Sequence, residues 1–134
     1  ILGFAFKANT NDTRESRAIN ICTSLIDEGA ILQIFDPRVT KEQIAKELNS
    51  SPRDSQKMSD NKGSWMKSKS INDSFDNIDA VVILTEWDEF KNLDWDSLSK
   101  KMRRPSWLFD TRSISNVEVA RKNGINIWEI GRGK

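Results

Sequence analysis

Short apolar runs alternate with amphipathic helical runs along this chain, and this alternation most strongly constrains its fold. The strand-like runs occupy residues 1–4, 30–35, 80–84, 106–109 and 125–130. Helical spacing of apolar residues or helix-forming composition is found at residues 14–28, 40–48, 72–77, 87–90, 95–102 and 117–123. Strands that alternate with helices through short links favour a parallel sheet with right-handed crossovers.

The run at residues 80–84 is apolar at every position, which is typical of a strand in the middle of a parallel sheet, covered on both faces. Gly29 and Gly124 stand where helix C-caps belong. At 134 residues the chain has the length of one ordinary domain. We therefore predict a single α/β domain, a Rossmann-like three-layer αβα sandwich whose mainly parallel sheet has about five or six strands.

Residues 49–69 differ from the rest of the chain. They are rich in Ser, Lys and Asp, and their large apolar residues are Met58, Trp65 and Met66. Because helical and strand periodicity is absent, we predict a polar surface insertion, which we favour over a functional lid. Trp65 and Met66 are expected to hold its far end against the body of the domain.

The chain contains no histidine and a single cysteine, Cys22. This composition excludes a Cys/His metal cluster, and it excludes histidine acid–base chemistry within the chain. One thiol cannot form an internal disulfide, which is typical of a reducing, cytoplasmic setting. Cys22 falls on the apolar side of the helix predicted at residues 14–28, so we expect a buried, unreactive thiol. We predict no catalytic residue and no metal site in this chain.

The charge balance is close to neutral, with a formal net charge of +1. Such a chain has no field that would favour nucleic acid or an anionic membrane, and it has no apolar stretch of about 18 residues that would span a bilayer. We therefore expect neither a nucleic-acid nor a membrane partner. The chain begins without methionine inside an apolar run, and we expect it to be the C-terminal piece of a longer protein.

In an open parallel α/β sheet, ligands bind at the carboxyl ends of the strands. The first loop of this chain follows a short apolar run and carries an aromatic ring, Phe6, and two cations, Lys7 and Arg14. Gly3 is the only glycine in this loop, so the dinucleotide-binding pattern G-x-G-x-x-G is missing. We expect an anionic ligand here to be held by side chains and not by bare glycine backbone.

Lys7 and Phe6 each allow a structural alternative. A lysine that directly follows a strand is commonly just solvated, whereas a compact ammonium at this edge also suits a phosphate or a sugar hydroxyl. Phe4 and Phe6 flank Ala5, so we expect one ring to pack inward and the other to point outward. An outward ring offers a flat apolar face to a base or a ribose, and the alternative is that both rings belong to the core.

Residues 12–16 (DTRES) predict a helix start, with Asp12 or Thr13 accepting hydrogen bonds from the free N–H groups of the first turn. Glu15 suits the positive end of the helix dipole, which Arg14 opposes. Arg14 is therefore expected to pair with Asp12 or Glu15, or to face a ligand or a neighbouring domain. We favour pairing and a domain contact over a direct ligand contact.

Arg112 follows the strand predicted at residues 106–109 and lies at another carboxyl-edge position. Arginine can donate two hydrogen bonds to phosphate or ribose oxygens. Asp110 is expected either to orient Arg112 or to cap the segment that follows. Because the strands of a parallel sheet end at one edge, Lys7 and Arg112 are predicted to converge on the same anion.

Asp36 ends the run at residues 30–35, the position from which an acid holds a ribose hydroxyl in a dinucleotide-binding unit. We reject an NAD site here because the glycine pattern is missing and Pro37 follows, and we favour the turn chemistry of Asp-Pro. After the run at residues 80–84, Thr85 is predicted to cap the next helix and Trp87 to cover the sheet edge or an interface. The five tryptophans are expected to be mostly core or interface residues.

Residues 3–7 (GFAFK), followed by residues 12–16 (DTRES), resemble the start of the C-terminal domain of the UDP-glucose dehydrogenases, members of the UDP-glucose/GDP-mannose dehydrogenase family. Three further motifs agree in order, namely FDP at residues 35–37, TEW at residues 85–87 and FDTR at residues 109–112. The chain departs from the family at Thr111, where the family usually has glycine.

The resemblance implies the UDP-binding domain of an oxidoreductase that oxidises UDP-glucose to UDP-glucuronate with two NAD. It implies that Phe6, Lys7 and Arg112 bind the nucleotide sugar. NAD and the family's catalytic cysteine would belong to N-terminal and central domains outside this chain, and the parent would form a homo-oligomer. The isolated chain would then be inactive. The alternatives are a related GDP-mannose or UDP-N-acetyl-sugar dehydrogenase, or a non-catalytic Rossmann-like interaction domain.

Overall fold

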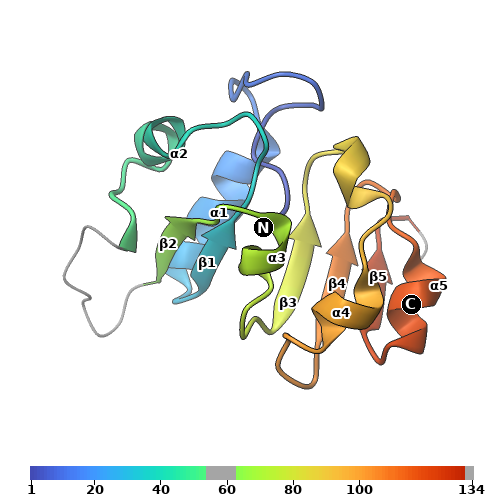
Figure 1. Cartoon of the computed structure of the whole chain (residues 1–134). Helices are drawn as coiled ribbons and strands as arrows, with labels where there is room; N and C mark the ends of the chain where they lie inside the picture. The colour runs from blue at the N-terminus through green and yellow to red at the C-terminus, as the bar shows by residue number, and fades with distance from the viewer. Residues whose placement is uncertain (54–62, 132–134) are drawn as a thin grey trace.

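The structure, a computed structural model of the chain, describes residues 1–53 and 63–131. Two groups of parallel strands form its sheet (Figure 1). In the first group β1 (Ile31–Ile34) pairs with β2 (Ser64–Lys67), so that Leu32 lies opposite Trp65. In the second group β4 (Trp107–Asp110) lies between β3 (Ala80–Ile83) and β5 (Asn126–Glu129).

The first residues of the chain join these two groups. Leu2 bridges Phe35 on one side and Ile83 on the other, in parallel with both. Its amide N–H donates to the carbonyl of Val82 at 2.8 Å, and its own carbonyl accepts from the amide of Leu84 at 2.9 Å. The order across the described residues is therefore β2, β1, the N-terminal residues, β3, β4 and β5. This is the doubly wound order, which reverses direction between the first residues and β3.

The N-terminal strand is shorter than the predicted run of residues 1–4. Gly3 turns the chain away with φ of +96°, and a Cβ there would lie 2.4 Å from the Cβ of Thr85. The fold class is confirmed as a parallel, Rossmann-like α/β domain. The five assigned strands lie at the lower end of the predicted number, with Leu2 completing the link between their two groups.

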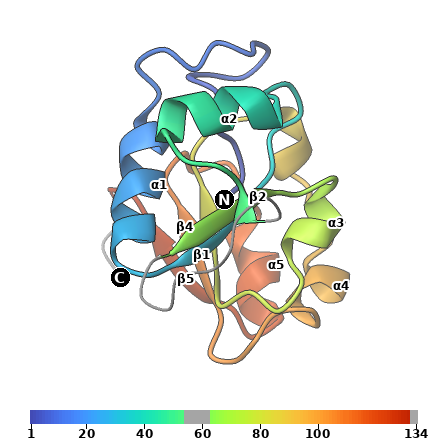
Figure 2. The ribbon, with the colours of Figure 1, turned by 90° about the vertical axis from the view of Figure 1, so that its left-hand side faces the viewer.

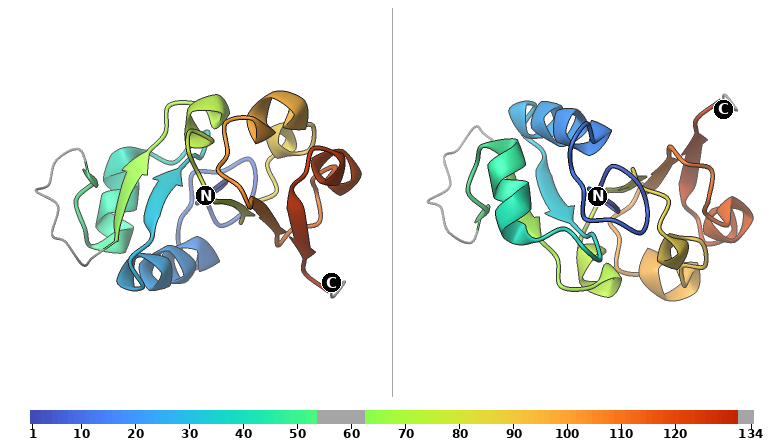
Figure 3. Two further views of the ribbon diagram at one scale, coloured as in Figure 1. Left: turned by 90° about the horizontal axis from the view of Figure 1, so that it is seen from below. Right: turned by 90° about the horizontal axis from the view of Figure 1, so that it is seen from above.

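Helices lie on both faces of the sheet (Figures 2 and 3). One face is covered by α1, and the opposite face carries α3, α4 and α5, while α2 packs against α1 near the end of β1. Their bounds, with that of the 3₁₀ helix η2, are α1 Arg17–Asp27, α2 Lys41–Leu48, α3 Ile71–Ser74, η2 Asp88–Phe90, α4 Trp95–Ser99 and α5 Val117–Lys122.

The start of α1 differs from the prediction. Ser16, and not Asp12 or Thr13, is the N-cap, and its hydroxyl accepts from the amide of Ala18 while donating to the carbonyl of Phe4 at 2.7 Å. Asp12 instead accepts from the amide of Arg14 within its own turn. Glu15 has φ of +60°, so the backbone reverses there and the helix begins at Arg17, three residues later than the predicted start at residue 14.

The prediction of a surface insertion over residues 49–69 is wrong at its C-terminal end. β2 lies within that range, and Trp65 is fully buried, with its indole N–H donating to the carbonyl of Ser50 at 3.2 Å. Trp65 is the one fully buried residue of this four-residue strand, so its sequence, SWMK, shows no alternation of apolar and polar residues. Residues 54–62 of the predicted insertion lie outside the described residues.

The tryptophans divide between core and surface. Trp65, Trp87 and Trp95 are buried, and Trp95 packs edge-to-face against Phe75 with ring centroids 5.9 Å apart. Trp107 and Trp128 are each 39% exposed on β4 and β5, on either side of Phe109, whose ring stacks on Trp107. The expectation of core positions is therefore confirmed for three of the five.

Cys22 is fully buried on α1, and burial raises the pKa of its thiol to about 12. We expect the folded protein to resist a thiol reagent at mildly alkaline pH, because the thiolate is the reactive form and is suppressed by burial. The same reagent should label Cys22 rapidly in denaturant, which provides the control. Rapid labelling of the native protein would contradict this burial.

Candidate functional site

A pocket of about 640 Å³ lies at the carboxyl edge of the sheet, beside the point where the strand order reverses. In Figure 1 the arrows of β3 and β4 point toward this edge, where the blue loop after the N-terminal residues lies. Residues from that loop, from α1 and from the loops after β3 and β4 line the pocket: Phe6, Lys7, Glu15, Ser16, Arg17, Ile19, Asn20, Glu86 and Arg112.

Phe6, Lys7 and Arg112, the residues predicted to bind the ligand, all line this one pocket. Phe4 is fully buried, whereas Phe6 is 45% exposed, as expected from the alternation around Ala5. The parallel topology therefore brings together two cations and an aromatic ring from sequence positions more than a hundred residues apart. That these residues bind a ligand stays a prediction.

Arg112 is held from one side of its guanidinium. Its Nε lies 3.0 Å from the carbonyl oxygen of Leu84, to which it donates, and 3.4 Å from the Oε2 of Glu86. Its backbone amide donates to Asp110 at 3.0 Å. Within the described part of the chain no partner bonds the terminal NH2 groups, so these donors are available to a ligand.

Lys7 differs from Arg112 because none of the described residues forms a hydrogen bond or an ion pair with its ammonium group. Glu86 lies between the two cations. Its Oε1 accepts from the backbone amide of Ala8 at 3.3 Å, directly after Lys7, while its Oε2 faces Arg112. Sequence reasoning did not assign Glu86 to the site, although its place directly after an apolar strand was the signal that could have done so.

The pocket mixes charges of both signs. Lys7, Arg17 and Arg112 supply three cations, and Glu15 and Glu86 supply two carboxylates. This arrangement suits a ligand that carries both an anionic group and hydroxyl or N–H donors, since the cations can hold the former and the carboxylates can accept from the latter.

Arg14 does not line the pocket. Its Nε and Nη2 donate to the carboxylate of Asp12 at 3.0 and 2.9 Å, and its side chain is 87% exposed. The favoured expectation of pairing is therefore confirmed. A contact of Arg14 with a neighbouring domain or a ligand stays a prediction.

Thr85 has a different role from the expected helix cap, and the partner of Trp87 was not foreseen. The hydroxyl of Thr85 donates to the carbonyl of Ala5 at 2.9 Å, so it fastens the Phe6 loop and does not cap a helix. Trp87 is buried, and its indole N–H donates to Asp36 at 3.2 Å. Both side chains were assigned from local sequence, whereas their partners are more than fifty residues away.

Thr111, which stands where the family usually has glycine, fits its position. The backbone of Thr111 does not adopt the positive φ that would favour glycine, and its hydroxyl donates to the carbonyl of Ile83 at 2.6 Å. The backbone reverses at Ser113 instead, with φ of +56°. The threonine therefore anchors the Arg112 loop to the end of β3.

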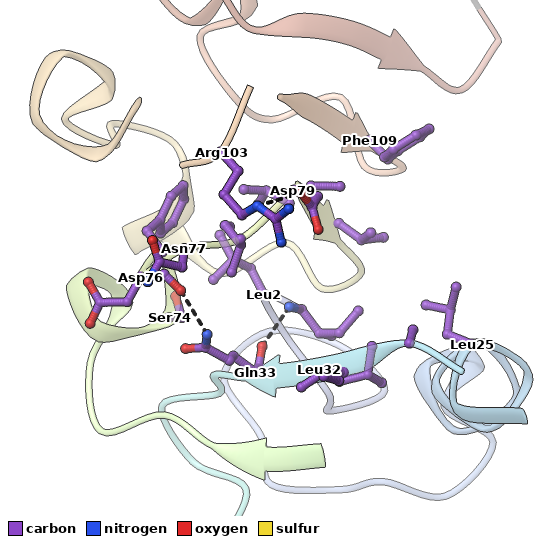
Figure 4. Close-up of a pocket in the computed structure, with 18 of the residues that line it drawn as sticks. Leu2, Leu25, Leu32, Gln33, Ser74, Asp76, Asn77, Asp79, Arg103 and Phe109 are labelled. Carbon is purple, nitrogen blue, oxygen red and sulfur yellow. Dashed lines mark hydrogen bonds and ion pairs between the residues drawn. The ribbon is translucent and has the colours of Figure 1, made fainter. Parts of the chain in front are cut away.

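A second pocket, of about 710 Å³, lies at the opposite edge of the sheet (Figure 4). Its wall is largely apolar, with Leu2, Leu25, Leu32 and Phe109 around it, and Gln33 donates across it to the carbonyl of Asp76 at 3.0 Å. It contains none of the predicted binding residues. We therefore place the candidate site in the smaller pocket, where charged groups converge at the carboxyl edge.

The described residues contain neither a metal site nor a membrane span. No group of three or more His, Cys, Asp or Glu side chains is placed to hold a metal ion. No helix among them has the length and apolar character needed to cross a membrane.

The fold and its charged pocket at the carboxyl edge define an α/β domain of the nucleotide-binding class. Residues 1–117 match the model of the UDP-glucose/GDP-mannose dehydrogenase family, UDP binding domain. The chain belongs to this family.

Two similar proteins, one from a plant and one from an insect, are named UDP-glucose 6-dehydrogenases. The chain is 40% identical over 142 residues to UDP-glucose 6-dehydrogenase 4 of Arabidopsis thaliana, covering 98% of this chain and 29% of that protein. It is 39% identical over 136 residues to UDP-glucose 6-dehydrogenase of Drosophila melanogaster, covering 98% and 28%. The chain thus spans less than a third of the length of these relatives.

The Asp12–Arg14 pair predicts how the pKa of Asp12 responds when Arg14 is removed. Hydrogen bonding to the Arg14 side chain lowers the pKa of Asp12 from 3.8 to about 2. The stabilisation from this pair is present above the usual pKa of the carboxyl group and is lost as the pH falls through about 2. Arg14→Ala should return the Asp12 midpoint toward 3.8, as followed by NMR. The Asp94 midpoint, lowered by the Ser97 side chain, should not move, and an unchanged Asp12 midpoint would contradict the pairing.

Proposed function

We propose that this chain is the nucleotide-sugar-binding domain of an NAD-dependent UDP-glucose dehydrogenase, and that its carboxyl-edge pocket holds the UDP end of UDP-glucose. The observation that carries the proposal is the convergence of Phe6, Lys7 and Arg112 on one pocket in a member of a UDP-binding family. A nucleoside diphosphate combines the groups this pocket suits, namely an anion, hydroxyls and a flat ring.

Each side chain has a distinct part in this proposal. The exposed ring of Phe6 supports the base or the ribose, because a flat apolar surface stacks on either. Lys7 and the terminal NH2 groups of Arg112 donate to diphosphate or ribose oxygens. Glu86 holds Arg112 in place through Nε and leaves its outer edge free for the ligand.

The chemical step belongs to parts of the parent protein outside this chain. The parent oxidises the C6 alcohol of the sugar to a carboxylate in two hydride transfers to two NAD. The described residues offer no reactive thiol for this step, since Cys22 is buried with a raised pKa. Binding the remote nucleotide end fixes the orientation of C6, and orientation lowers the barrier to reaction.

The partners follow from the same proposal. This domain closes against the N-terminal and central domains of its own polypeptide, which hold NAD and the catalytic thiol, and the parent assembles as a homo-oligomer in the cytoplasm. The relatives support the first part of this proposal, because more than two thirds of their length lies outside the matched region.

Truncating either site cation should weaken UDP binding. We expect Lys7→Ala and Arg112→Ala each to lose roughly 1.5–3 kcal/mol of binding free energy, the usual effect of removing a charged hydrogen bond. Calorimetric titration of the 134-residue chain with UDP measures this loss, and a thermal melt checks the fold. Lys100→Ala is the matched control, since Lys100 directly follows α4, is exposed, does not line the pocket and pairs with Asp96. Unchanged UDP affinity in both folded variants would refute the site.

Base preference separates UDP-sugar from GDP-mannose enzymes. In the same titration UDP should bind more tightly than GDP, because the proposal commits the pocket to the smaller pyrimidine base. Tighter binding of GDP would move the assignment to a GDP-mannose dehydrogenase, and no binding of either nucleotide would favour an interaction domain without a nucleotide ligand.

The chain by itself should not reduce NAD when supplied with UDP-glucose, since it lacks histidine and an accessible thiol. Absorbance of NADH measures this directly, and an active full-length UDP-glucose dehydrogenase serves as the positive control. Turnover above background by the 134-residue chain would contradict the proposal that catalysis belongs to the other domains of the parent.

A further inference from the structure

Two buried carboxylates stand at the carboxyl edge beside the candidate site, and the proposed function uses neither. Asp36 follows β1 and is 1% exposed, and Asp110 ends β4 and is fully buried. A buried charge is normally paired with an opposite charge or a metal. Among the described residues no lysine or arginine side chain pairs with either carboxylate, and backbone N–H groups surround them instead.

Asp36 accepts five hydrogen bonds from three segments of the chain. Its Oδ2 accepts from the amides of Phe4 at 2.8 Å and Ala5 at 2.9 Å, as well as from the Trp87 indole. Its Oδ1 accepts from the amides of Arg38 at 2.8 Å and Val39 at 3.0 Å. The carboxylate therefore joins the loop after β1 to the two residues that directly precede Phe6 and Lys7.

Asp110 makes the equivalent arrangement in the loop after β4. Its Oδ1 accepts from the amide of Arg112 at 3.0 Å. Its Oδ2 accepts from the amides of Ile114 and Ser115 at 2.9 and 2.8 Å, and from the Ser115 hydroxyl at 2.7 Å. The backbone that carries Arg112 is thus wrapped around one buried carboxylate.

We propose that Asp36 and Asp110 are a pair of positioning residues, each of which holds the loop that carries one cation of the nucleotide site. Asp36 positions the loop of Phe6 and Lys7, and Asp110 positions the loop of Arg112. This inference rests on the proposed function. Neither carboxylate touches the ligand, because both are buried beneath the loops that they hold.

The charge of the carboxylate is what the role requires. A carboxylate accepts at both oxygens, and its hydrogen bonds to N–H donors are shorter and stronger than those of a neutral acceptor. Asparagine has the same shape but only one accepting atom, so its NH2 group would face N–H donors that the second oxygen now satisfies. A loop ordered before the ligand arrives loses less conformational entropy on binding, which preserves affinity.

Crossed double-mutant cycles on the 134-residue chain test this inference, with UDP affinity measured by calorimetry. Asp36→Asn and Asp110→Asn should each weaken UDP binding roughly tenfold, the loss expected when charge-assisted hydrogen bonds are removed. In the Lys7→Ala background the loss from Asp36→Asn should fall to about threefold or less, while in the Arg112→Ala background it should stay near tenfold. Asp110→Asn should show the opposite pattern.

Each carboxylate is the matched control for the other, because both are buried and both bind backbone amides. A purely structural role would weaken UDP binding equally in both backgrounds, so additive losses in all four cycles would overturn the proposal. Unchanged affinity in both folded asparagine variants would overturn it as well. If the wild-type chain fails to bind UDP, the proposed function fails instead, and that result is separate from the cycles.

Hydrogen exchange of the unmutated, ligand-free protein decides the case if the asparagine variants do not fold. The amides of Phe4, Ala5 and Arg112 should then exchange as slowly as the amide of Leu84, which is bonded to Leu2 within the sheet. Exchange of these three amides at the rate of exposed loop amides would show that the carboxylates do not hold the loops, and it would overturn the proposal.

Discussion

The hydrogen bonds of Leu2 join the two halves of the sheet, and the rest of the structure depends on them. β1 and β3 do not pair with each other, so the N-terminal residues supply the only link between the two groups of described strands. Because the strand order reverses there, the loops after Leu2 and after β3 separate toward opposite faces of the sheet. The pocket of Phe6, Lys7, Glu86 and Arg112 lies where they part.

The loops at this edge are held by polar side chains near the strand ends, which bond to other segments of the chain. Thr85 bonds the carbonyl of Ala5, Thr111 bonds the carbonyl of Ile83, and Asp36 binds the amides of Phe4 and Ala5. Loops without regular secondary structure must satisfy their backbone groups in some other way, and here buried side chains do so. Buried hydrogen bonds therefore hold the loops that carry the charged residues of the pocket.

Sequence patterns predicted the residues that line the candidate pocket more successfully than the residues that support it. The convergence of Lys7 and Arg112 followed from topology, since both lie in loops that follow parallel strands. The helix cap was assigned to Asp12 or Thr13 and not to Ser16, and Thr85 was assigned to a cap that it does not form, because a polar residue beside a turn offers several local partners. The turn predicted at Asp36 is confirmed by its bonds to the amides of Arg38 and Val39, whereas its bonds to Phe4 and Ala5 were not foreseen. Trp65 was expected to hold the end of the insertion against the body, which its burial confirms. The strand around it was not predicted, since a strand with one buried side chain has too little periodicity to be seen in sequence.

The sequence by itself determined the class of fold, the order of the helices and of the assigned strands other than β2, and which charged residues follow the strands. These features depend on the local spacing of apolar residues, which can be read directly from a single sequence. Only the tertiary structure decided that Glu86 faces Arg112, that Ser16 caps α1, and that Asp36 holds the Phe6 loop. These contacts join residues on different segments, and their partners are chosen by burial and hydrogen-bond geometry after the sheet has formed.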